Sequence, residues 1–344
     1  MRRATSFATA APRSCVTGWW YFVAGSVGQT IVPLTGGYYL ADATGSSARW
    51  AYLYAAGILA VAVTANLAGA RVGRTLQLAL AGGVAAVLLL ASVASVPQVS
   101  ASRLHPLAPH GLHGVGSAIV VLFFAFAGWE AVVHLAGEFR NPARDVMRAT
   151  WATLVIVTVL YLAVATAVVA TGTYGSTATD HLAIGTLLQG GFGVSARVAA
   201  AVAALVISLE TTNAFVAAVS RLCYALARDR WLPAPLAAVN RHNVPVGGVC
   251  AVGTVGGAGL ALAWLCDWGT RQIVFVPSTL VIAVYLSGTA AAVKLLRGRA
   301  RWIAAVGMLL TACALPFALV HMLVPVVVTA LALTCRLLCR TSLR

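Results

Sequence analysis

Long apolar segments dominate this chain of 344 residues and decide what it can fold into. A helix rises about 1.5 Å per residue, so it needs about 20 apolar residues to cross the roughly 30 Å hydrocarbon core of a bilayer. Ten segments are close to that length: Cys15–Leu40, Arg49–Ala70, Thr75–Val96, Gly116–Leu135, Ala149–Thr171, Val194–Ala227, Val246–Cys266, Ile273–Leu295, Trp302–Val320 and Met322–Leu338. The pattern predicts an all-α integral membrane protein with one transmembrane domain over residues 1–344.

The composition excludes a water-soluble enzyme. Charged residues make up 9% of the chain and hydrophobic residues 60%, whereas a soluble domain carries about 25% charged residues. The net charge of +15 would suit nucleic acid, but no basic segment interleaves with aromatic residues on a polar face. The lipid bilayer is therefore the expected partner, and nucleic acid is not.

The basic residues predict an orientation. With ten spans both termini lie on one side, and placing that side in the cytoplasm puts 19 of the 23 Lys and Arg residues there. This bias is what the positive-inside rule expects of a multi-pass protein in the cytoplasmic membrane. Most tryptophans fall near predicted span ends, but Trp19, Trp20 and Trp129 do not, so they need another role.

Neither a metal, a cofactor nor a nucleotide is indicated. The seven cysteines contain no CxxC pair, and His105, His110 and His113 match no ligand spacing. No GxxxxGK[ST] phosphate loop occurs, so an ATP-driven motor is unsupported.

Glu130 lies in the middle of the fourth span, directly after Gly128 and Trp129. A charge at the bilayer centre costs roughly 2.5–3.5 kcal/mol on insertion scales and is a functional hypothesis by default. Apolar helix, small residues and then a carboxylate are typical of a discontinuous transporter helix. The alternative is a continuous helix in which Glu130 pairs with His134, one turn later.

Glu210 lies mid-span in the sixth segment, beside Ser208, Thr211, Thr212 and Asn213. These side chains should face other helices or water, because lipid would leave them unsatisfied. They form either a polar wall of a transport pathway, with Glu210 as a gating or proton-coupling site, or hydrogen bonds between helices.

Three stretches resemble amino acid permeases of the amino acid–polyamine–organocation superfamily, which have the LeuT-like helical-bundle fold. Residues 123–131 (FFAFAGWEA) with 138–145 (EFRNPARD) resemble the family's sixth helix, residues 213–233 its eighth, and residues 16–20 the start of its third. The phrase HLAGEF at 134–139 is most similar to the methionine and branched-chain amino acid exporter branch.

This resemblance implies roles for particular residues. Backbone carbonyls around Ala125, Phe126, Ala127 and Gly128 would bind the substrate's amino group, with Phe124 as an aromatic lid. Glu130 would couple gating or protonation. The eighth helix would line the cavity with Asn213 and Glu210. The family has twelve helices, however, and nothing before Cys15 is apolar enough to span, so the resemblance also implies an N-terminally incomplete permease that lacks the first two.

Three functions compete on this basis. The first is a secondary active transporter of amino acids, acting as permease, antiporter or exporter, with neutral apolar substrates and proton or ion coupling. The second is a non-transporting scaffold or an inactive permease fragment, which the two lacking helices favour. The third is an intramembrane enzyme using Glu130, Glu210 and His134, but no nucleophile or zinc motif supports it.

Overall fold

The computed structural model consists of helices joined by turns and loops, with no strand among the residues that it describes, which are 2–69, 74–105, 108–126, 128, 141–192, 195–241 and 243–341. The α-helices are α1 (Arg2–Ala43), α2 (Trp50–Leu67), α3 (Arg74–Ala94), α4 (Gly111–Ala125), α6 (Pro142–Thr171), α7 (Thr177–Phe192), α8 (Ser195–Arg228), α9 (Val246–Cys266), α10 (Thr270–Ile273), α11 (Phe275–Leu295), α12 (Arg299–Ala312), α13 (Leu315–Ala318) and α14 (Leu323–Thr341). Short 3-10 turns are η1 (Val96–Gln98), η2 (Ala101–Leu104), η4 (Ala234–Ala237) and η5 (Leu319–His321). The all-α prediction is confirmed.

The described parts of the ten predicted apolar segments are mostly helical, and the fourth is helical up to Ala125. Over the described residues, seven helical stretches are at least 18 residues long and apolar enough to cross a membrane, and α4 and most of α14 form shorter apolar helices. Two features were not predicted from the sequence. Helix α1 begins at Arg2, well before Cys15, and α7 lies between the predicted spans Ala149–Thr171 and Val194–Ala227.

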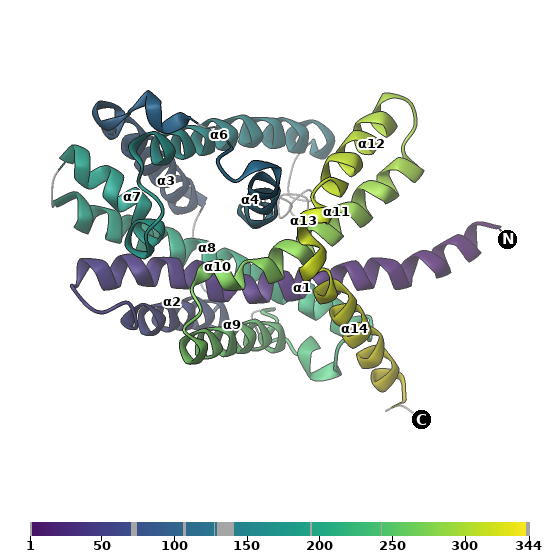
Figure 1. Cartoon of the computed structure of the whole chain (residues 1–344). Coiled ribbons are helices and arrows are strands. Elements are labelled where there is room, and N and C mark those ends of the chain that lie inside the picture. The colour runs from purple at the N-terminus through teal and green to yellow at the C-terminus, as the bar shows by residue number, and fades with distance from the viewer. Residues whose placement is uncertain are drawn as a thin grey trace.

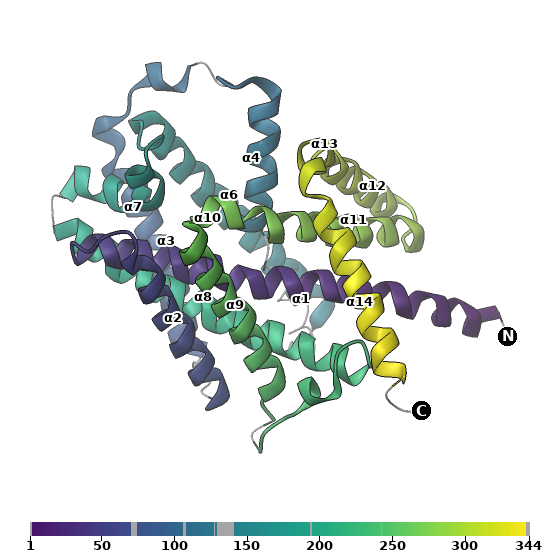
Figure 2. The ribbon, with the colours of Figure 1, turned by 60° about the horizontal axis from the view of Figure 1, so that its bottom comes forward.

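Helix α1 is the centre of the bundle. In both overall views it runs through the molecule and its N-terminal end projects beyond the other helices (Figures 1 and 2). It packs against α2, α8, α9, α11 and α14. The contact with α2 requires Gly37, because a Cβ there would lie 2.1 Å from the carbonyl oxygen of Ala51. The two backbones therefore meet directly, as small residues allow in membrane helix pairs.

The largest apolar core lies where α1, α8, α9, α11 and α14 meet, around Trp19 and Phe22. The two tryptophans of α1 that stand away from a span end are held by hydrogen bonds. Trp19 Nε1 donates to the carbonyl of Trp231 at 3.1 Å, and Trp20 Nε1 donates to the carbonyl of Pro325 at 3.1 Å. Both indoles therefore bury an apolar ring while satisfying the N–H donor.

Candidate functional site

Helix α4 ends inside the predicted fourth span. Its last residue is Ala125, and its 15 residues extend only about 22 Å, less than the hydrocarbon thickness. The N–H of Phe126 still bonds to the carbonyl of Leu122 at 3.3 Å. Gly128 has φ 116°, a backbone conformation open to glycine because it carries no Cβ. The described part of the span is thus helix followed by non-helical backbone.

Two packing contacts fix where this helix end lies. A Cβ on Gly28 of α1 would lie 3.2 Å from the ring tip of Phe124, so the Phe124 ring rests against the backbone of α1. A Cβ on Gly128 would lie 2.7 Å from the ring tip of Phe215 on α8. The end of α4 therefore contacts the central helix on one side and α8 on another.

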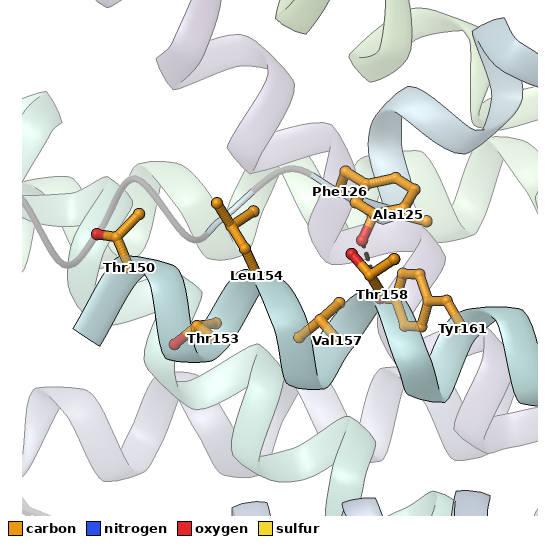
Figure 3. Close-up of a pocket in the computed structure, with 8 residues that line it drawn as sticks. All are labelled: Ala125, Phe126, Thr150, Thr153, Leu154, Val157, Thr158 and Tyr161. Carbon is orange, nitrogen blue, oxygen red and sulfur yellow. Dashed lines mark hydrogen bonds between the residues drawn. The ribbon is translucent and has the colours of Figure 1, made fainter. Parts of the chain in front are cut away.

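A pocket opens between the end of α4 and the exposed face of α6, with a volume of about 200 Å³. Figure 3 shows Ala125 and Phe126 beside the α6 side chains that form the other wall. Those side chains are Thr150, Thr153, Leu154, Val157, Thr158 and Tyr161. Tyr161 joins the two walls, since its hydroxyl donates to the Ala125 carbonyl at 3.0 Å.

The lining of this pocket is uncharged and mostly apolar, with a few polar groups. The residues found around it offer one backbone carbonyl, four hydroxyl groups and the apolar surfaces of Phe126, Leu154 and Val157, and none of them is charged. Hydroxyl and carbonyl oxygens can hydrogen-bond an ammonium group, and the apolar surfaces can cover an aliphatic side chain. The pocket is therefore suited to holding a small polar molecule with an apolar part.

Asn213, a predicted substrate-binding residue, faces a different neighbour. Its side-chain oxygen accepts a hydrogen bond from Asn66 Nδ2 of α2 at 2.7 Å, and its carbonyl accepts from the same nitrogen at 3.2 Å. Two residues along a helix correspond to a turn of about 200°, which places Asn213 and Phe215 on nearly opposite faces. In the described structure it is Phe215 that contacts the helix end at Gly128.

The other polar residues of α8 are partly inside the bundle. Glu210 is half-buried, and no ion pair or hydrogen bond for it occurs among the described residues. Thr212 is fully buried, and within those residues its hydroxyl has no hydrogen-bond partner. Ser208 is buried where α8 passes Gly36 of α1. The polar run at 208–213 thus points in several directions rather than forming one wall.

Part of the predicted site lies outside the described residues. Ala127, Trp129, Glu130 and His134 belong to this part. The choice between Glu130 as a coupling group and Glu130 as a partner of His134 therefore stays a sequence-based prediction.

Sequence reasoning missed the α6 wall of the pocket. A signal was present, because Thr150, Thr153, Thr158 and Tyr161 recur at helical spacing on one side of an otherwise apolar segment. Phe215 was also missed, because an aromatic residue in an apolar span looks like ordinary core.

Taken together, the fold and the site define a class of protein: a polytopic helical membrane protein with a helix that ends within a predicted span, beside a small uncharged pocket. Comparison with known proteins identifies the family to which the chain belongs. The family model for amino acid permeases matches residues 4–334. The chain belongs to this amino acid permease family, which is a family of transporters and not of enzymes.

Individual relatives agree with this assignment. The uncharacterized amino acid permease YecA of Bacillus subtilis is 30% identical over 288 residues, covering 83% of this chain and 67% of the relative. The L-methionine/branched-chain amino acid exporter YjeH of Escherichia coli is 29% identical, covering 61% and 49%. The branched-chain amino acid permease BcaP of Lactococcus lactis is 30% identical, covering 53% and 41%. The aligned region spans from under half to two thirds of the length of these relatives.

Proposed function

We propose that this chain is a secondary active transporter of neutral, apolar amino acids in the cytoplasmic membrane, with both termini in the cytoplasm. The observation that carries the proposal is the end of α4 at Ala125, inside a predicted span and beside a pocket with hydroxyl groups. Non-helical backbone at membrane depth is tolerated only where it is buried in protein or lines a cavity. Transporters use such interruptions to bind substrate and coupling ions.

The substrate class follows from the pocket and from the relatives. A zwitterionic amino acid needs acceptors for its ammonium group, which backbone carbonyls from Ala125 to Gly128 would supply. The uncharged lining favours an aliphatic side chain over a charged one. Two of the relatives are named for branched-chain amino acids or methionine, which supports the same class. The proposal covers import and export alike.

Four further residues have proposed roles. Phe124, resting on Gly28 of α1, acts as the aromatic lid. Glu130 couples transport to a proton or another cation, because a carboxylate at membrane depth can change its charge state during the cycle. Asn213 and Glu210 of α8 contribute to binding or coupling.

Uptake by reconstituted protein tests the proposal. Liposomes containing the full chain should accumulate labelled leucine or methionine, with labelled lysine and glutamate as charged controls, and the rate should change with an imposed pH gradient. Glu130→Gln should flatten the pH dependence, and Glu210→Gln is the matched comparison at the second mid-span carboxylate. No amino acid uptake above empty liposomes would refute the transporter, and unchanged pH dependence in Glu130→Gln would refute its coupling role.

A further inference from the structure

Tyr161 connects α6 to the helix end in two ways. Its hydroxyl donates to the Ala125 carbonyl at 3.0 Å. Its ring meets the ring of Phe126 edge-on, with centroids 5.1 Å apart and planes at 67°, which is a favourable geometry for two aromatic rings. One side chain therefore contacts both the last residue of α4 and the first residue after it.

The carbonyl of Ala125 lies in the last turn of α4 and accepts a hydrogen bond from outside the helix. In an unbroken α-helix the carbonyl of residue 125 accepts from the N–H of residue 129. The last carbonyls of a helix need partners from outside it, and Tyr161 supplies one. A carbonyl oxygen has two lone pairs, so a donor from a neighbouring helix and a donor from a ligand can share it.

The position of Tyr161 on α6 suits this role. Thr150, Leu154, Val157 and Tyr161 follow the i, i+4, i+7, i+11 spacing that keeps residues on one face of a helix. That face forms the pocket wall opposite Ala125 and Phe126 (Figure 3). Tyr161 therefore connects the two walls of the pocket.

We propose that Tyr161 is a positioning residue, which holds the end of α4 so that the Ala125 carbonyl and the Phe126 ring face the pocket in the geometry that binds substrate. This inference rests on the proposed function for its transport readout. The structural part, that the hydroxyl of Tyr161 stabilises the last turn of α4, stands independently.

Tyr161→Phe is the test, because it removes the hydroxyl and keeps the ring beside Phe126. Thr166→Val is the matched control, since it removes an exposed α6 hydroxyl that lies outside the pocket. A neutral hydrogen bond contributes about 1 kcal/mol, equivalent to about a fivefold change. We expect Tyr161→Phe to raise the half-saturating leucine concentration about fivefold and to change the maximal uptake rate less than twofold. A general loss of folded carrier would instead lower the maximal rate alone.

Hydrogen exchange on the full-length protein in detergent, without substrate, separates this proposal from the transporter proposal. Tyr161→Phe should speed amide exchange in the peptide covering Leu122–Phe126 about fivefold, and Thr166→Val should leave it unchanged. An unchanged exchange rate in Tyr161→Phe overturns the positioning role, whether or not the protein transports. Unchanged half-saturation in an active Tyr161→Phe variant, or a fall in maximal rate alone, overturns it too. If the unmodified protein takes up no amino acid, the transporter proposal fails and the exchange experiment still decides the role of Tyr161.

Discussion

Replacing Gly128 by alanine should selectively destabilise the helix end beside the pocket. Gly128 has φ 116° and lies against the ring of Phe215. A methyl group at this position meets two separate obstacles, one in its own backbone and one in α8. The substitution therefore tests whether the non-helical backbone after α4 is the structure that the protein maintains.

The magnitude can be worked out from these two obstacles. A residue with a Cβ held in a sparsely populated backbone conformation costs about 1–3 kcal/mol. The added Cβ would lie 2.7 Å from the ring tip of Phe215, about 0.8 Å closer than a relaxed carbon contact of about 3.5 Å. Because the ring can tilt, we assign the contact about 1 kcal/mol, at the low end of overpacking penalties. Gly128→Ala should therefore lose about 2–4 kcal/mol of stability.

A double-mutant cycle with Phe215→Leu separates the two terms, with stability measured by denaturant unfolding in detergent. Phe215→Leu makes room for the methyl group, so the double variant should regain about 1 kcal/mol relative to the sum of the single variants. The backbone penalty should remain. Stability of Gly128→Ala within about 0.5 kcal/mol of the unmodified protein would refute the conformation at Gly128. Strict additivity would refute its contact with Phe215.

Two further predictions concern the helices around the site. Gly37→Ala should destabilise the protein by about 1–3 kcal/mol, because the new Cβ would lie 2.1 Å from the backbone of α2. Gly57→Ala is the control, since it has open space around it and should stabilise the protein by up to about 1 kcal/mol. Equal melting temperatures for the two variants would contradict the close packing of α1 on α2 at Gly37. The ring of His181 stacks on the ring of Tyr38, with centroids 4.0 Å apart. Burial lowers the pKa of His181 below the ordinary 6.5, despite the opposing charge of Asp180. The stability that the neutral imidazole contributes should therefore be complete above pH 6.5 and be lost as the pH falls through the lowered pKa. Melting curves at several pH values should show that His181→Phe, which keeps a ring on Tyr38, removes this dependence, and an identical pH profile in the variant would show that other groups cause it.

The sequence predicted the helices well because membrane burial leaves a local signal. Twenty consecutive apolar residues can satisfy their backbone hydrogen bonds in lipid only as a helix, so each span can be predicted without knowing which helices pack beside it. The positions of helix ends are harder to predict. Arg2–Arg13 is too polar to span a membrane, yet α1 includes it, and α7 lies between two predicted spans.

The sequence predicted that the helix would be interrupted near Gly128, but it did not predict what surrounds the end of α4. Gly128 after an apolar helix indicated an interruption, and α4 ends three residues before it. The neighbours depend on how helices far apart in the chain pack, which a single sequence does not record. Asn213 illustrates the difference, because its polarity was compatible with either a cavity wall or a hydrogen bond between helices, and its described hydrogen bonds are with Asn66 of α2.

The contacts at the end of α4 explain why local sequence alone could not define the site. Three helices hold this end: α1 at Gly28, α6 through Tyr161 and α8 through Phe215. Each interaction contributes on the order of 1 kcal/mol, which is similar to the helix penalty of a single glycine. No one of them dominates, so a single substitution should weaken the helix end rather than abolish it. Substitutions on two of the three helices should be coupled, because they act on the same few backbone groups.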